Sequence, residues 1–232
     1  MDETAWVGWV VDAQVDFMDP DGRLYVKDLE NPDDVGSVQV VPELRRAVAW
    51  MREKCRVVVF TGDWHGLEDA EIDPDNPDPA AGTYPPHCMG RSPDPEERAG
   101  AEIIPEIRPV APLVLEIGAT EEEARKLAAQ AVEEDRPVFI HKNRFNVFEG
   151  NEATEAFLAG LGKRLARPLE FWVAGVSRDV CVTEAVDGMR RRDFAVTALS
   201  DATWGLGLEP EAETLARWSR GGRVITTAQL PG

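Results

Sequence analysis

The 232-residue sequence has few residues of several kinds that would indicate particular protein classes. Its three cysteines are an odd number and too few for a disulfide framework, and no apolar run approaches the ~20 residues that span a bilayer. Lys and Arg number 25 against 43 Asp and Glu, which gives a formal net charge of -18. Because such a charge repels phosphate backbones and anionic lipids, we expect no nucleic-acid partner and no membrane role.

Two further features are missing. No glycine-rich phosphate loop follows any candidate strand, which weakens a nucleotide-binding interpretation. The residues Met1 to Thr4 form neither a basic segment nor the start of an apolar one, as a secretory signal would. Together with the odd cysteine count, this predicts a cytoplasmic protein with reduced thiols.

What the sequence does contain indicates a folded α/β protein. Hydrophobic residues make up 43%, including seven Trp and eight Phe, enough apolar surface to build a core. Buried strands are predicted at 6–11, 56–61, 113–117, 138–141, 171–175, 194–199 and 223–226. Helices are predicted at 42–54, 120–132, 152–165, 179–192 and 210–219. This alternation favours a mainly parallel sheet covered by helices on both faces, in a single domain over residues 1–232.

The segment 63–100 interrupts this alternation. It is rich in proline, as in Asp73 to Pro79, and it is too long for a passive connection. Loops of this length in compact domains are usually functional or disordered, and Trp64, His65, Tyr84 and His87 indicate that its ends are ordered.

Three residues at predicted strand ends could carry catalysis. Cys181 follows a strand and a turn at the start of a helix, where the helix dipole favours a thiolate. Lys142 follows another strand, in a chain with only four other lysines, and could stabilise that thiolate. Asp12 ends the first strand and could accept and return the thiol proton. The alternatives are a packing cysteine, a solvent-facing lysine and a turn or cap aspartate.

A second group could bind a metal ion. His65 and His87 are two of only three histidines, and Asp63 stands two positions before His65. This set suits a divalent transition metal, and a further carboxylate from Glu68, Asp69 or Glu71 could complete it. A hydrogen-bonded Asp–His pair without metal is the alternative.

Taken together and in this order, six segments resemble the isochorismatase-like cysteine hydrolases, and most of all their nicotinamidase/pyrazinamidase branch. The segments are 11–17, 61–65, 85–88, 100–102, Lys142 and 175–182. The resemblance implies a three-layer α/β/α fold with a six-stranded, mainly parallel sheet. It also implies a triad in which Cys181 is the nucleophile, Lys142 steadies the thiolate and Asp12 shuttles protons.

The same resemblance assigns the remaining site residues. Asp63, His65 and His87 match ligands of zinc, iron or manganese, and this metal would hold the pyridine nitrogen of the substrate. A cis peptide between Val176 and Ser177 is implied, with the amides of Ser177 and Cys181 forming an oxyanion hole. The residues that match the walls around the substrate ring are Phe17 and Tyr84.

The chain also departs from the family pattern. The third metal histidine is absent, and Glu71 replaces it best by spacing, ahead of Glu68 and Asp69. Residues 89–98 lack the usual Gly-Thr and carry an acidic insertion, and residues 113–134 look inserted as well. We therefore expect substrate walls that differ from those of a standard nicotinamidase.

The resulting expectation is a nicotinamidase of NAD salvage that hydrolyses a small-molecule amide through a thioester, with family habit suggesting a homo-oligomer. One alternative is a metal-independent amide or ureide hydrolase of the same superfamily, which would keep Asp12, Lys142 and Cys181. Another is a non-catalytic acidic α/β binding protein. Isochorismate hydrolysis is less favoured, because that branch does not use the cysteine nucleophile.

Overall fold

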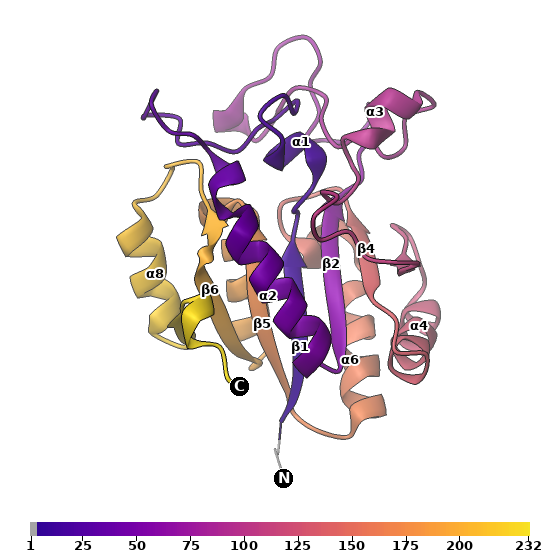
Figure 1. The fold of residues 1–232 in the computed structure, drawn as a ribbon. Helices are drawn as coiled ribbons and strands as arrows, with labels where there is room; N and C mark the ends of the chain where they lie inside the picture. The colour runs from indigo at the N-terminus through magenta and orange to yellow at the C-terminus, as the bar shows by residue number, and fades with distance from the viewer. Residues whose placement is uncertain (1–3) are drawn as a thin grey trace.

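The computed structural model describes residues 4–232, and its centre is one sheet in which every strand pair is parallel (Figure 1). The strands are β1 (Ala5–Val11), β2 (Val57–Asp63), β3 (Leu113–Leu115), β4 (Val138–Lys142), β5 (Leu169–Val176), β6 (Ala195–Trp204) and β7 (Arg223–Ile225). Their order across the sheet is β3-β4-β2-β1-β5-β6-β7. The predicted α/β class and parallel sheet are confirmed. The sheet has seven strands where the family resemblance implied six, and its two edge strands, β3 and β7, are only three residues long.

Helices cover both faces of this sheet, as predicted. The α-helices of residues 4–232 are α1 (Val15–Met18), α2 (Val41–Lys54), α3 (Pro95–Ala99), α4 (Glu121–Glu133), α5 (Val147–Gly150), α6 (Thr154–Leu165), α7 (Thr183–Arg190) and α8 (Glu211–Ser219). One core cluster joins the sheet to α4, α6 and α7, and the other joins it to α2 and to the segment around Ile103. In Figure 1, α2 lies in front of the sheet and α6 behind it. The central strands are therefore buried on both faces, which explains their continuous apolar sequences.

Helix starts follow local chemistry that the sequence predicts. At α4, the Thr120 hydroxyl accepts a hydrogen bond from the Glu123 amide at 3.2 Å, while the Glu123 carboxylate accepts one from the Thr120 amide at 2.8 Å. This reciprocal capping box satisfies amides that a helix start leaves without partners. Pro42 stands in the first turn of α2, where its missing N–H costs no hydrogen bond.

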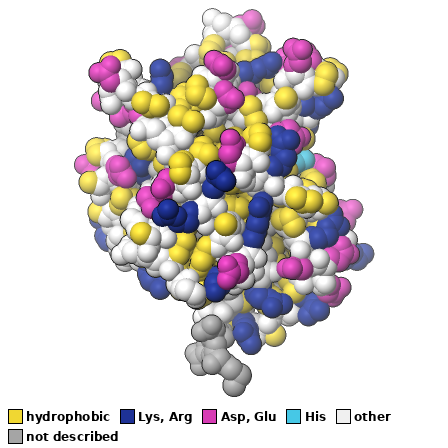
Figure 2. Space-filling view, viewed as in Figure 1, with side chains coloured by type: hydrophobic (Ala, Val, Ile, Leu, Met, Phe, Trp, Pro, Cys, Tyr) yellow, Lys and Arg dark blue, Asp and Glu magenta, His cyan; other side chains and the backbone are white. Residues whose placement is uncertain are grey.

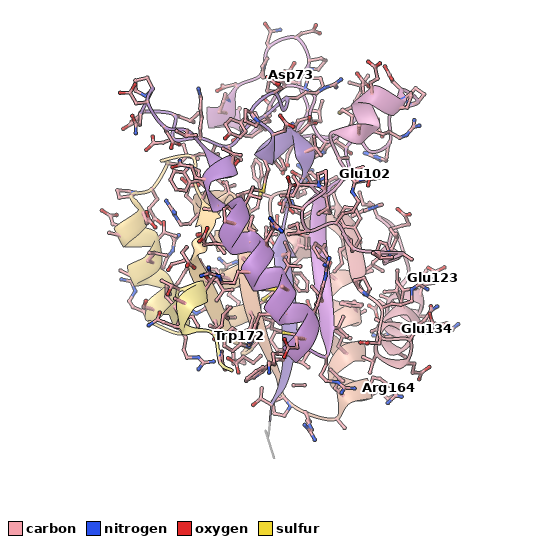
Figure 3. The ribbon with its side chains drawn as sticks, viewed as in Figure 1. Asp73, Glu102, Glu123, Glu134, Arg164 and Trp172 are labelled. Atoms are coloured by element: carbon pink, nitrogen blue, oxygen red, sulfur yellow. The ribbon has the colours of Figure 1, made fainter. Side chains whose placement is uncertain are left out.

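The long 63–100 segment is ordered throughout much of its length. It contains the short helix α3 and a 3-10 turn, η2 (Pro79–Ala81), and Ile72 pairs with Tyr84 in an isolated bridge. Figure 3 labels Asp73 on this segment at the top of the molecule, and Arg164 near the end of α6 at the opposite end. The segment thus lies over the carboxyl ends of the strands, the end at which parallel sheets bind ligands.

Glycine is required at the end of β5. Gly175 has a φ of 129°, and a Cβ there would stand 2.0 Å from the Val11 carbonyl oxygen, so only glycine lets β5 approach β1 at this position. Among residues 4–232, no helix combines the length and apolar composition that crossing a bilayer requires.

Candidate active site

Four neighbouring strands bring the predicted site residues to one end of the sheet. Lys142 ends β4 and Asp63 ends β2, and these two residues are direct partners in the strand register. Asp12 follows β1, and Cys181 follows β5 on a π-helical turn, η3 (Arg178–Val182). Because β4, β2, β1 and β5 are consecutive in the sheet, residues far apart in the sequence lie side by side.

Lys142 is the centre of this group. Its side chain is 1% exposed, and its ammonium lies 2.9 Å from Asp12 Oδ2, contacts Asp63 Oδ1 and donates to the Arg144 carbonyl at 3.0 Å. Three acceptors thus surround a group with three donors. Burial opposes the charge, but Asp12 and Asp63 outweigh it and raise the pKa of Lys142 well above its usual value. The side chain is therefore an ammonium at neutral pH.

Asp12 is the better proton acceptor of the two carboxylates. Complete burial raises the pKa of Asp12, against the opposing effect of Lys142, and the Thr61 hydroxyl donates to its Oδ1 at 2.7 Å. Burial also tends to raise the pKa of Asp63, but Lys142 and His65 outweigh this effect and lower that pKa. One lysine therefore holds two carboxylates with different basicities, and Asp12 is the one suited to take and return a proton.

Cys181 is buried, and the groups around it shift the pKa of its thiol in opposite directions. Burial raises the pKa of the thiol well above its usual value, Lys142 lowers it, and Asp12 and Asp63 raise it again. The sequence predicts a thiolate favoured by Lys142 and the helix start. That prediction includes the lowering effect of Lys142 on the pKa but omits the larger, raising effect of burial. A raised pKa favours the thiol over the thiolate, so a nucleophilic role for this sulfur would require a base that takes its proton.

Asp63, His65 and His87 form a compact buried cluster next to this lysine. One potential ligand atom from each lies within 4.8 Å of the others. Asp63 Oδ2 stands 3.8 Å from His65 Nε2 and 3.9 Å from His87 Nε2. Asp63 thus presents one oxygen to Lys142 and the other to both imidazoles, so it links the predicted triad to the predicted metal ligands.

The hydrogen bonds of the two imidazoles fit metal binding. His65 Nδ1 pairs with Asp69 Oδ2 at 3.2 Å, and His87 Nδ1 with the Pro85 carbonyl at 2.7 Å. An acceptor at Nδ1 fixes the ring so that Nε2 carries the lone pair, as in histidines that ligate metals. His65 Nε2 is buried without a hydrogen-bond partner. These three residues therefore fit a divalent transition metal.

The protein groups around the two histidines shift their basicities in opposite directions. Burial lowers the pKa of His65, but the neighbouring carboxylates of Asp63 and Asp69 outweigh it and raise that pKa to about 9. Burial dominates at His87 and lowers its pKa, against the attraction of Asp63.

The three carboxylates considered for a further ligand lie in different surroundings. The Glu68 side chain is 72% exposed and pairs with Arg91. Asp69 is held by His65, Arg91, the Gly66 amide and Asn143, so it orients His65 from behind. Glu71 is buried with Oε2 unpartnered, while its Oε1 accepts from the Phe145 amide at 3.1 Å. Glu71 has an oxygen available, although it lies outside the group of three atoms.

Sequence reasoning missed two positioning residues. The Gln14 side chain donates to the Asp63 carbonyl at 2.8 Å and accepts from the Asp63 amide at 2.7 Å. Asp16 accepts from the Cys88 amide at 2.6 Å, directly after His87. Both stand in the Asp12 to Phe17 segment, and their complete or nearly complete burial makes them conspicuous once the fold is known.

The remaining predicted residues surround a cavity beside the thiol. Phe17, Tyr84, Ser177 and Cys181 all line a cavity of about 450 Å³. The peptide between Val176 and Ser177 is cis, as the resemblance implied. The His87 ring lies 5.5 Å from Phe17 and 6.2 Å from Tyr84, between centroids, so these two aromatic side chains stand next to the cluster of Asp63, His65 and His87.

Comparison with known proteins gives a family and a set of similar folds. The model of the isochorismatase domain matches residues 7–229. None of the curated proteins compared with the sequence matches it.

Three solved structures illustrate the similarity. PnC1 from L. infantum in complex with nicotinate has a TM-score of 0.68 and 21% identity, over 100% of this chain and 97% of that one. N-carbamoylsarcosine amidase from Thermoplasma acidophilum has a TM-score of 0.65 and 20% identity, over 99% and 100%. Pyrazinamidase of Pyrococcus horikoshii in complex with zinc has a TM-score of 0.63 and 22% identity, over 95% and 98%. At these identities the likeness concerns the fold alone.

Proposed function

The chain belongs to the isochorismatase family, and from this premise we propose that it is a metal-dependent cysteine amidohydrolase that converts nicotinamide to nicotinate and ammonia. One observation carries the proposal. Asp63 contacts the ammonium of Lys142 with one oxygen and faces the Nε2 atoms of His65 and His87 with the other. Because one carboxylate contacts both the lysine beside the thiol and the two imidazoles, the arrangement suits a reaction that uses a cysteine nucleophile and a bound metal ion together.

Substrate binding follows from the cavity walls. Phe17 and Tyr84 are rigid aromatic side chains that would enclose a flat ring next to Cys181. A divalent transition metal, namely zinc, iron or manganese, held by Asp63, His65, His87 and, as we propose, Glu71, would supply a Lewis acid that binds the ring nitrogen. Fixing the ring in this way would hold the amide carbon within reach of the sulfur.

The chemical steps use the triad. The thiol of Cys181 loses its proton to Asp12 as the sulfur attacks the amide carbon, and Lys142 stabilises the charge that develops on the sulfur. The amides of Ser177 and Cys181 are proposed to hold the oxyanion. The C–N bond then breaks, and the proton on Asp12 passes to the departing ammonia.

The second half of the reaction restores the enzyme. A water molecule gives its proton to Asp12 and attacks the thioester carbon, the C–S bond breaks, and nicotinate is released. The proton on Asp12 returns to the Cys181 sulfur. The raised pKa of Asp12 suits it to both transfers, because an acceptor that is too acidic would not take the proton.

Ammonia release from nicotinamide tests the proposal. The assay compares wild-type protein with Cys181→Ala, with chelated protein and with chelated protein to which zinc, iron or manganese is returned. We expect turnover that disappears with Cys181→Ala, is lost on chelation and returns with metal. Absence of turnover in metal-loaded wild type would reject nicotinamide as the substrate, and turnover that survives chelation would favour a metal-independent hydrolase.

A further inference from the structure

The cavity beside Cys181 is larger and more apolar than a pyridine ring with its amide requires. Its volume of about 450 Å³ lies in the range of sites for drug-sized ligands, about 300–1,000 Å³. Phe17 and Tyr84 border the part beside the metal-ligand cluster, and Leu24, Val26, Leu29 and Leu208 extend it further. Cys181 and Ser177 supply polar groups at one place, and apart from the hydroxyls of Tyr25 and Tyr84 the other side chains of the lining are apolar.

No charged side chain lines this cavity among the residues that the structure describes. A substrate with a carboxylate in its body would lose its hydration there without gaining a cationic partner, which is costly. A neighbouring cavity has the opposite character, because Glu71, Arg144, Glu149 and Glu184 line it. Val180 borders both cavities, so the charged side chains line the neighbouring cavity on one side of Val180 and the uncharged cavity lies on the other.

The apolar walls are fastened to the turn that carries the nucleophile. Asp179, two positions before Cys181, accepts hydrogen bonds from the amides of Leu206 at 2.9 Å and Leu208 at 2.8 Å. The Leu29 amide donates to the Leu206 carbonyl at 2.9 Å, which joins the segment around Leu29 to the same wall. These hydrogen bonds tie the cavity wall to the turn that carries Cys181, and a preformed site binds more tightly because less order must be created.

Two of these wall residues leave apolar surface open to solvent. Leu29 is 62% exposed and Leu208 is 60% exposed, and both border the cavity. Figure 2 shows hydrophobic side chains among the loops above α2, at the end of the molecule that carries the carboxyl ends of the strands. An apolar group that covered both leucines would gain about 25 cal/mol for each Å² removed from water.

From these observations we infer that the preferred substrate is a neutral primary amide whose acyl group carries an apolar body larger than a pyridine ring, extending from Cys181 towards Leu29 and Leu208. The inference rests on the proposed amidohydrolase function and specifies its substrate class. It predicts discrimination against amides with a charged body, since the lining offers no counter-charge.

A matched set of amides tests this inference. Ammonia release is measured for nicotinamide, for 5-phenylnicotinamide, in which the ring nitrogen stays free, and for the same compound bearing a carboxylate on the phenyl group. We expect kcat/KM on the order of tenfold higher for 5-phenylnicotinamide than for nicotinamide, the scale that apolar pocket contacts give. The carboxylate should remove this gain.

Substitution of Leu29 and Leu208 tests whether these residues contact the apolar group of the substrate. In the double variant Leu29→Ser, Leu208→Ser, the ratio of kcat/KM for the phenyl amide to that for nicotinamide should fall on the order of tenfold. Val110→Ser is the control, because Val110 is 84% exposed and lies outside the cavity lining. It should leave the ratio unchanged.

The outcomes separate the inference from the function on which it rests. Turnover of nicotinamide with no preference for the phenyl amide, or a preference that the double variant retains, would overturn the inference and leave the amidohydrolase function standing. Absence of turnover for every amide in metal-loaded wild type would overturn both.

Discussion

Two lysines of this chain face carboxylates in opposite surroundings. Lys142 lies 2.9 Å from Asp12 with both side chains at most 1% exposed, whereas Lys126 lies 2.6 Å from Glu122 on the surface of α4 with 73% and 76% exposed. The pair on α4 forms between residues four positions apart, while the buried pair needs three strands in register. The distances are similar, so the difference in consequences comes from solvent.

Burial decides what each pair does. Water screens the exposed pair, which contributes little to stability. Around Lys142 the groups have lost their hydration, so each depends on its partners, and their pKa values move far from the usual ones. The buried pair therefore suits catalysis, where shifted proton affinities are useful, whereas the exposed pair leaves proton affinities and stability nearly unchanged.

The largest effect is expected from Lys142→Ala. It leaves Asp12 and Asp63 buried without their shared cation, and removing one partner of a buried ion pair costs about 3–5 kcal/mol. Urea unfolding should show this loss of free energy of unfolding, and ammonia release should disappear. Lys142→Ala unfolding at the same urea concentration as wild type would contradict the comparison.

Asp63→Asn is expected to come next. The amide keeps the shape but removes the charge that faces Lys142, His65 and His87. Calorimetric titration of the purified variant with zinc should show loss of binding, because a neutral amide is a far weaker ligand for this metal. Wild-type zinc affinity in this variant would place the metal elsewhere.

A smaller effect is expected from Asp69→Asn. Asp69 holds His65 through Nδ1 and stands behind the cluster of Asp63, His65 and His87, the proposed metal ligands. Groups that orient a ligating histidine typically change metal affinity about 10–100-fold when they are removed. The same titration measures it, and Glu68→Gln is the matched control because Glu68 is exposed and points to Arg91. Equal affinities for the two variants would refute an orienting role for Asp69.

The thiol provides a pH-dependent test. Burial, Asp12 and Asp63 raise the pKa of Cys181 and outweigh Lys142, so the thiolate fraction should keep rising above pH ~9. Iodoacetamide alkylation of Cys181, followed by mass spectrometry with Cys181→Ala as the blank, should increase through that range. A rate that levels off below pH ~8 would show that Lys142 dominates instead.

The smallest effect is expected from Lys126→Ala. Its partner Glu122 is fully exposed, and alanine is itself a good helix former. The urea midpoint and the ammonia release should match those of wild type at physiological ionic strength. A destabilisation comparable to that of Lys142→Ala would show that burial is not what separates the two lysines.

Much of the fold follows from local sequence patterns. Short Val-rich runs predict the strands, and Thr120 with Glu123 predicts the start of α4, because these features depend on residues within a few positions. The placement of Asp12, Lys142 and Cys181 at one end of the sheet follows from parallel strands as well, since their carboxyl ends share one edge.

Other features depend on contacts between distant segments. Asp69 hydrogen-bonds His65, whereas Glu71 leaves one oxygen without a partner, although the two residues are only two positions apart, so spacing alone leaves the choice between them open. The clamp of Gln14 on Asp63 joins residues 49 positions apart. A cavity wall built from Leu29 and Leu206 joins segments that no local pattern connects.

The sequence by itself determined the residue types, the parallel α/β plan and the strand ends at which the chemistry stands, because secondary structure responds to local periodicity and side-chain chemistry. Only the tertiary structure decided the strand order, the sharing of Asp63 between Lys142 and the two histidines, the raised pKa of the Cys181 thiol and the uncharged cavity beside it. These depend on which groups exclude water from one another, and burial is a property of the assembled fold.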